Sequence, residues 1–396
     1  MKKSFKATIC ASCIGYFTQA ILINFPPLLF VTFQKSFELT LGQVSLLIAM
    51  NFATELIVDL LCSKFVPRIG YRRCVIMAQV ASIFGLVLFP TLPFVMSNKL
   101  LALIIANIWC GIGGGMLEVL ISPIVEACPT TNKSGMMSLL HSFYCWGQMG
   151  VVLLSTIYFL TIGIDNWRVL SFIWAIVPLS SLVMFFFVPI NTLEEEGVAS
   201  AFKPLFKNKV FWILFVMMLC AGASEIAVSQ WASTFAEAGL GVEKWIGDLI
   251  GPCLFAVTMG ATRVFFAKKA DSLVLENAIL ISALFTIGAY VLIVFSPLPI
   301  ISLIGCSLCG VGCGILWPGS FSISTKRIPH GGVAMFGLLA LAGDLGCLSG
   351  PVLAGAISDA LGGELKAGFL FAMLFPILLV IMVLLLKRIS KRNELK

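Results

Sequence analysis

Charged residues are scarce in this chain. Only 11% of its 396 residues are Asp, Glu, Lys or Arg, whereas 59% are hydrophobic. A soluble domain of this length cannot hide so much apolar surface behind so few charges, but a lipid bilayer accommodates it. The charges also lie in the gaps between long apolar segments. The sequence therefore predicts an all-α membrane protein with 12 transmembrane helices, and it excludes a soluble domain.

Motifs of enzyme chemistry are lacking as well. There is no nucleotide-binding loop, metal-ligand cluster or paired catalytic constellation. The chain has only two histidines, and neither lies near the CxxC pairs Cys10/Cys13 and Cys306/Cys309. We therefore expect no enzyme activity, no metal and no cofactor, and we interpret these cysteines as buried small hydrophobes. Without an ATP-binding motif, uphill transport has to draw on an ion gradient.

The apolar segments are each long enough to cross about 30 Å of hydrocarbon at about 1.5 Å per residue. The first is long and has no small-residue cleavage site after a short apolar core, so we interpret it as a retained helix and not as a signal peptide. The expected spans are 7–33, 41–65, 73–96, 99–126, 134–160, 167–189, 210–238, 243–267, 274–296, 299–324, 331–358 and 366–387.

The basic residues predict the orientation of these spans. Most of the 26 Lys and Arg residues fall at the termini and in the loops on the same side as the termini. Those on the other side are Lys35, Lys99, Arg168, Lys244 and Lys366. This asymmetry predicts that both termini are cytoplasmic. The net charge of +7 then has a topological explanation and matches anionic lipid head groups, so we expect no nucleic-acid partner. The short termini favour a bacterial inner membrane.

A polar stretch, NTLEEEGVASAFKPLFKNK, interrupts the apolar pattern at the middle of the chain. Six expected spans precede it and six follow. We therefore predict an N-terminal six-helix bundle over residues 1–190, a cytoplasmic linker over 191–209 and a C-terminal six-helix bundle over 210–396.

The two halves also echo each other. One segment reads GIGGGMLEVLISPIVEACP from Gly111, and another reads GVGCGILWPGSFSISTKRIP from Gly310. Three glycines match in register, and each segment has a Pro in mid-span and another at its end. Small residues let membrane helices pack closely, and Pro softens a helix for bending. Parallel repeats of this kind belong to alternating-access transporters, so we predict pseudo-symmetric bundles; the alternative is a chance likeness between Gly-rich helices.

Six plus six spans, the central linker and the basic loop KFVPRIGYRR (64–73) resemble the major facilitator superfamily. The superfamily's loop signature has a Gly, an Asp four residues later, and then Arg-x-Gly-Arg-Arg. Here Arg68, Gly70, Arg72 and Arg73 fit that rhythm with the Arg pair shifted by one residue, while a Ser and a Pro replace the Gly and the Asp. The resemblance implies a gate formed by these four residues, with Asp59 as a partial substitute for the missing Asp.

Five acids lie in mid-span, namely Glu55, Asp59, Glu118, Glu225 and Asp344. Ionisable groups at membrane depth are costly unless they are hydrated or paired, so each is a functional candidate. No basic residue lies well inside a span except Arg263, which is near a cytoplasmic end, and several acids therefore lack an obvious cationic partner. Such carboxyls can load and release a proton, as coupling to a proton gradient requires. We expect proton coupling at Glu118, Glu225 and Asp344, although Asp344 could equally be a structural hydrogen-bonding partner.

The segment LEVLISP around Glu118 resembles the fourth helix of the fucose-permease-like sugar:proton symporters. These carry a Leu-Glu pair followed by an Asn-Pro pair; Glu118 and Pro123 match, and Ser122 replaces the Asn. The resemblance implies that Glu118 takes part in proton coupling and sugar binding. The alternative is that Glu118 only packs between helices as a hydrogen-bonding partner. Those permeases also have an acid in the first span, where this chain has only Gln19 and Asn24.

Aromatic rings and amides suit the C–H faces and hydroxyls of a sugar. The polar-aromatic cluster SLLHSFYCWGQMG opens the fifth span, and further candidates lie in spans 1, 7 and 10. His141 could instead be a packing residue. The expected substrate-binding residues are Gln19, Asn24, His141, Trp146, Gln148, Gln230, Trp231 and Trp317.

These observations predict a secondary active transporter that works by alternating access and takes up a sugar or similar small polar solute together with protons. We expect a monomer in the lipid bilayer. The alternative is a proton-coupled efflux antiporter of drugs or lipophiles. Such antiporters show a Gly-Pro signature in span 5; this chain reads GQMGVVLLSTIYF there, although span 11 does read GDLGCLSGPVLAG. A receptor or scaffold on a transporter fold is a third class, and the unpaired membrane acids argue against it.

Overall fold

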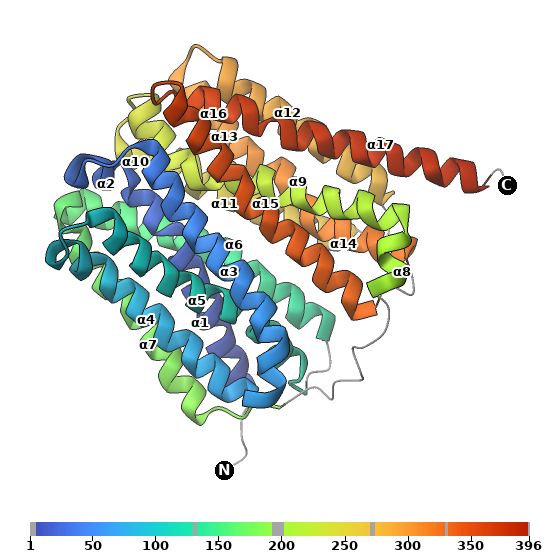
Figure 1. Ribbon diagram of the computed structural model, residues 1–396, viewed down its shortest axis with the longest axis horizontal. Helices are drawn as coiled ribbons and strands as arrows, with labels where there is room; N and C mark the ends of the chain where they lie inside the picture. The colour runs from blue at the N-terminus through green and yellow to red at the C-terminus, as the bar shows by residue number, and fades with distance from the viewer. Residues whose placement is uncertain (1–4, 130–132, 192–201, 270–273, 329–331, 395–396) are drawn as a thin grey trace. The chain divides into compact units, whose positions relative to one another are not determined.

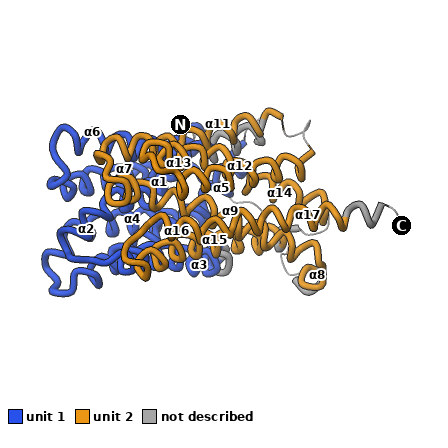
Figure 2. Tube along the Cα trace, turned by 90° about the horizontal axis from the view of Figure 1, so that it is seen from above, with its two compact units in different colours: residues 1–194 blue, residues 195–396 orange. Residues whose placement is uncertain are grey.

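The computed structural model describes residues 5–129, 133–191, 202–269, 274–328 and 332–394, and all regular structure in these ranges is helical. The chain divides into two compact units, residues 1–194 and 195–396, which Figure 2 shows in separate colours. The division falls within the predicted linker. Among the described residues, 12 helical stretches are long and apolar enough to cross a membrane, and six belong to each unit. The predicted fold class is confirmed.

Unit 1 contains seven α-helices and two short 3-10 turns (Figure 1). Their bounds are α1 Phe5–Asn24, η1 Pro26–Leu29, α2 Phe30–Phe37, α3 Leu41–Ile69, α4 Tyr71–Val95, α5 Lys99–Glu126, α6 Lys133–Ile162, η2 Ile164–Asn166 and α7 Trp167–Phe187.

Unit 2 contains the remaining helices, including two π-helical turns, η3 and η4. Their bounds are α8 Phe202–Lys207, α9 Lys209–Thr234, η3 Phe235–Gly239, α10 Lys244–Asp248, η4 Leu249–Cys253, α11 Leu254–Lys269, α12 Leu275–Phe295, α13 Pro299–Cys313, α14 Leu316–Arg327, α15 Gly332–Ala360, α16 Leu365–Ala372 and α17 Leu374–Glu394.

Local sequence explains where several helices begin and end. Thr40 begins α3 with a capping box, in which its hydroxyl accepts from the Gln43 backbone N–H at 3.2 Å and the Gln43 side chain accepts from the Thr40 N–H at 2.9 Å. Gly70 separates α3 from α4 at φ +92°, a conformation that side chains rarely adopt. Pro26 and Pro27 form the 3-10 turn that divides the first span into α1 and α2.

The glycine repeat makes the same contacts in both units. In unit 1 a Cβ at Gly111 or Gly115 would collide with α3, and one at Gly113 would collide with Ser82 of α4. In unit 2 the matching Gly310 and Gly314 face α11, and Gly312 faces α12. The glycines therefore allow α5 and α13 to approach two neighbours each. The equivalence of these contacts supports the internal repeat predicted from the sequence.

Prolines inside the helices leave carbonyl groups that other helices satisfy. Pro90 has no N–H to donate to Leu86 O, and the hydroxyl of Ser171 from α7 donates to that oxygen at 2.6 Å.

The predicted burial of the CxxC cysteines holds in part: Cys306 and Cys309 are fully buried, whereas Cys10 is exposed and Cys13 is partly exposed. Cys10 and Cys13 lie on a face of α1 that borders an apolar groove, so their burial was wrongly predicted.

Candidate functional site

Two side-chain pairs join α1 to α5 in unit 1. Gln19 Nε2 donates to Glu118 Oε2 at 3.0 Å, and the hydroxyls of Tyr16 and Ser122 are 2.8 Å apart. Tyr16 precedes Gln19 by about one helical turn, and Ser122 follows Glu118 by about one turn, so the four side chains form one polar strip across the helix pair. The structure thus brings together Gln19 and Glu118, which the sequence placed in separate spans.

Glu118 is held by a neutral partner. Within the described part of the chain, no Lys, Arg or His lies within salt-bridge distance of its carboxyl. The amide oxygen of Gln19, Oε1, is buried and has no hydrogen-bond partner among the described residues. Buried polar atoms are nearly always partnered, so this acceptor is suited to receive a donor from a substrate or from a protonated Glu118.

The acids of α3 pack against the glycine-rich face of α5. Glu55 is buried and accepts from Asn51 Nδ2 at 3.2 Å. A Cβ at Gly114 would lie 2.5 Å from Glu55 Oε1, and one at Gly115 would lie 3.0 Å from Asp59 Oδ1. The absence of side chains on α5 therefore creates the room that these two carboxyls occupy.

The other candidates of unit 1 lie in different environments. Gln148 is almost fully buried on α6, whereas Trp146 on the same helix is 40% exposed. Asn24 is buried and donates to Ala20 O within its own helix at 3.0 Å. The side chain of His141 lies outside the described part of the structure.

The basic loop contributes a helix cap. Arg72 donates from Nη1 to Phe185 O at 2.5 Å and from Nη2 to Val188 O at 2.6 Å, so its guanidinium satisfies the carbonyls at the end of α7. Arg68 and Arg73 are exposed. The printed contacts of Arg72 thus connect α4 to α7, and gating by this loop with Asp59 stays a prediction.

Glu225 of unit 2 has a cationic partner. Arg263 Nη2 of α11 lies 3.3 Å from both carboxyl oxygens of Glu225 on α9. The argument that membrane acids lack partners is therefore wrong for Glu225. The pairing could not be read from sequence because the two residues are 38 positions apart on different helices.

Of the remaining candidates of unit 2, some are buried in helix packing and others are partly exposed. Trp231 is fully buried and its Nε1–H donates to Pro351 O at 2.9 Å, and Gln230 beside it is also buried. Trp317 is partly exposed, and its ring lies directly against Gly343 of α15. Asp344, the next residue, is likewise partly exposed. Trp317 thus packs on the helix that carries Asp344.

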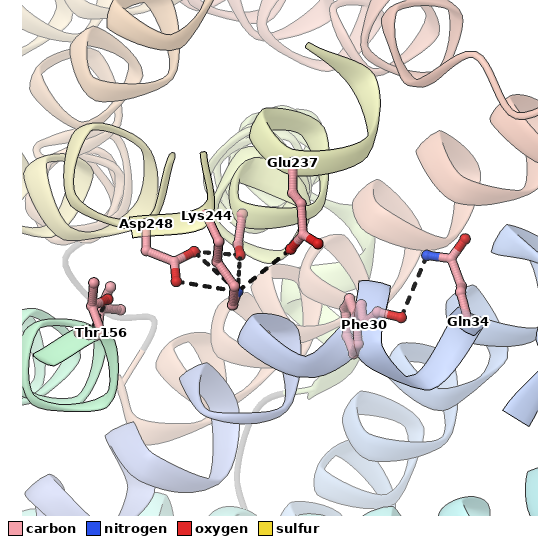
Figure 3. Close-up of polar contacts among 8 residues, drawn as sticks. Phe30, Gln34, Thr156, Glu237, Lys244 and Asp248 are labelled. Carbon is pink, nitrogen blue, oxygen red and sulfur yellow. Dashed lines mark hydrogen bonds and ion pairs between the residues drawn. The ribbon is translucent and has the colours of Figure 1, made fainter. Parts of the chain in front are cut away.

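Sequence reasoning missed a second charged cluster in unit 2. Lys244 Nζ lies 3.1 Å from Asp248 Oδ2 and 3.9 Å from Glu237 Oε2, and Figure 3 shows its ammonium between the two carboxylates. Ser233 Oγ donates to Asp248 Oδ1 at 2.5 Å. Asp248 is fully buried. A Lys followed four residues later by an Asp at the start of a span is the signal that could have identified it.

The π-helical turns flank this cluster. Glu237 lies in η3, and Asp248 immediately precedes η4. Pro252 inside η4 cannot donate to the preceding turn, and Ser307 of α13 donates its hydroxyl to Ile250 O. Such turns widen a helix locally and occur often where side chains must be redirected.

One family model matches the chain, and several solved structures share its fold. The family model of the Major Facilitator Superfamily matches residues 8–348. No curated protein sequence matches the chain. Among solved structures, a bacterial homologue of the human lysosomal transporter Spinster, in an inward-facing and occupied conformation, has 13% identity and a TM-score of 0.75 over 98% of each chain.

Two sugar symporters are also similar in structure. The D-xylose–proton symporter has 15% identity and a TM-score of 0.76 over 95% of each chain. The fucose:proton symporter FucP of E. coli has 17% identity and a TM-score of 0.65, covering 96% of this chain and 98% of that one. At these identities the likeness shows the fold alone.

Proposed function

The chain belongs to the major facilitator superfamily, and we propose that it is a proton-coupled transporter that takes up a sugar or similar small polar solute by alternating access. The observation that carries this proposal is the pair of Glu118 and Gln19 at 3.0 Å. A carboxyl held at membrane depth by a neutral amide can change its protonation state without leaving a buried cation unpaired.

The same pair offers the donors and acceptors that a sugar hydroxyl needs. When Glu118 is ionised it accepts from the Gln19 amide, and Gln19 Oε1 is left to accept from the substrate. When Glu118 is protonated it both donates and accepts, which matches a hydroxyl group. The neighbouring hydroxyls of Tyr16 and Ser122 extend this polar surface. Protonation of Glu118 then favours substrate binding, and proton release favours substrate exit.

The polar candidates of unit 2 have subsidiary roles in this proposal. Asp344 and Trp317 are both partly exposed and are proposed to bind the substrate or a second proton. Glu225 is paired with Arg263, so we assign it to an ion pair that exchanges partners during the transport cycle. The amides Gln148 and Gln230 complete the proposed binding set.

The test is uptake of labelled hexoses, deoxyhexoses and disaccharides into proteoliposomes with an imposed proton gradient. Wild type is compared with Glu118→Gln, and with Glu276→Gln as a matched carboxyl-to-amide control at a pair outside the candidate site, where Glu276 accepts from Arg327 at 2.6 Å. We expect one sugar to accumulate in wild type and in the control. Glu118→Gln should lose gradient-driven accumulation and keep counterflow exchange.

Two results would overturn this function. If Glu118→Gln accumulates the sugar as wild type does, Glu118 is not the proton site. If no sugar enters with folded wild-type protein, the substrate class is wrong, and lipophilic compounds tested for proton-driven export become the next candidates.

A further inference from the structure

A groove of about 550 Å³ runs along the surface of unit 2. Its walls are α11 and α12, and its base is formed by Val311 and Gly312 near the end of α13 and by Ile315 just before α14. The two wall helices both pack on α13 but have little packing with each other among the described residues. Because α11 and α12 have little packing with each other, a groove is left between them over the end of α13.

The lining of this groove is apolar and faces outward. Phe265 on one wall is 61% exposed, and Ile281 on the other is 67% exposed. Two threonines and Ser282 also line the groove. The threonine hydroxyls are satisfied, because Thr258 donates to Ser307 O at 2.7 Å and Thr262 donates to Thr258 O at 2.9 Å. The two threonines therefore offer the groove no free donor. In a chain that spans a membrane, such a surface is filled by hydrocarbon.

The dimensions of the groove favour an acyl chain over a protein helix. Its residues on α11 extend from Thr258 to Phe266, which is about 12 Å at about 1.5 Å per residue. A membrane-spanning helix is about 30 Å long and 10 Å wide, and it would need a longer and wider groove.

One end of the groove is basic. Lys268 and Lys269 are exposed in the last turn of α11, three and four residues after Phe265, so they lie on the same helical face. The nearest acid described on α12, Glu276, already pairs with Arg327 at 2.6 Å.

We propose that this groove is a binding site for an anionic phospholipid, with one acyl chain between α11 and α12 and the phosphate group at Lys268 and Lys269. The apolar lining accounts for the acyl chain, and the two lysines account for the choice of an anionic head group. The acyl chain would fill the space between the exposed faces of α11 and α12 and so connect the two helices. This proposal does not depend on the transported substrate.

The test measures lipid retained by the protein. Purified, mildly delipidated protein is titrated with phosphatidylglycerol or phosphatidylcholine of the same acyl chains, and bound lipid is counted by native mass spectrometry. We expect wild type to bind phosphatidylglycerol more tightly than phosphatidylcholine. Lys268→Gln/Lys269→Gln should reduce phosphatidylglycerol affinity about 30-fold and leave phosphatidylcholine unchanged.

Filling the groove should remove both lipids. Ala261→Phe places a ring between the walls, and Leu284→Phe places one on an exposed part of α12 outside the groove as its control. The basic pair is matched by Lys207→Gln/Lys209→Gln, which removes two exposed lysines elsewhere in unit 2. The proposal is overturned if wild type binds the two lipids equally, or if Ala261→Phe retains as much lipid as Leu284→Phe. It is also overturned if Lys207→Gln/Lys209→Gln reduces phosphatidylglycerol binding as much as Lys268→Gln/Lys269→Gln does. A protein dimer that Ala261→Phe dissociates would also overturn it.

Discussion

The cluster of Lys244, Asp248 and Ser233 permits a quantitative prediction. Lys244→Met removes the ammonium that lies 3.1 Å from a carboxylate whose side chain is 1% exposed. Ser233 still donates to Asp248, but one hydroxyl cannot compensate a buried negative charge. Removing one partner of a buried ion pair costs about 3–5 kcal/mol. For a domain of this size, that corresponds to a fall in melting temperature of about 6–20 °C.

Removing both charges should be less harmful than removing one. In Lys244→Met/Asp248→Asn the amide oxygen still accepts from Ser233, and no charge is left buried. Its cost should be about 1–2 kcal/mol, the range for loss of a few hydrogen bonds. The double variant should therefore be more stable than Lys244→Met alone by about 1–4 kcal/mol, the difference between the two costs, and should melt at a higher temperature.

The assay is thermal unfolding of purified protein in detergent, followed by intrinsic fluorescence at one fixed scan rate. Lys207→Met removes an exposed lysine of the same unit and should change the melting temperature by less than about 2 °C. The reasoning is refuted if the double variant is as unstable as Lys244→Met, because the loss would then come from packing of the lysine stem and not from the orphaned charge.

Two further predictions concern packing and capping. A Cβ at Gly346 would collide with the backbone oxygen of Leu219 on α9, so Gly346→Ala should destabilise the protein by about 1–3 kcal/mol in the same melting assay. Gly337 lies in the same helix with open space around it, so Gly337→Ala should be neutral or slightly stabilising. Arg72→Met should lower the free energy of unfolding by about 1.5–3 kcal/mol because the last carbonyls of α7 lose their donors. Arg73 is exposed, so Arg73→Met should change the stability little. Equal losses of stability in the two variants would contradict the capping role of Arg72.

The glycine repeat illustrates how far the sequence reaches. The matched spacing of Gly111 and Gly310 was visible without a structure, and it predicted close helix packing in two related halves. It could not say which helix approaches each glycine, because that depends on how each helix is rotated about its axis. The structure assigns α3 to Gly111 and α11 to Gly310.

The candidate site shows the same division. Glu118 was identified as an acid in an apolar span, but its contact with Gln19 joins residues 99 positions apart. The partner of Glu225 was missed for a related reason: Arg263 looked like a residue at a span end, and its side chain is long enough to reach the neighbouring helix. Asp248 was missed because only acids in mid-span were considered, and Asp248 lies near the start of the expected span 243–267.

The sequence by itself determined the class of this protein, the twelve spans, the central break and the internal repeat. These follow from the length of apolar segments and the position of charges, which are local properties of the chain. Only the tertiary structure decided which acids have a cation, which have a neutral partner, and where a groove is left between α11 and α12. These depend on side chains from distant segments meeting at fixed helix rotations, and helix rotation is set by packing across the whole bundle.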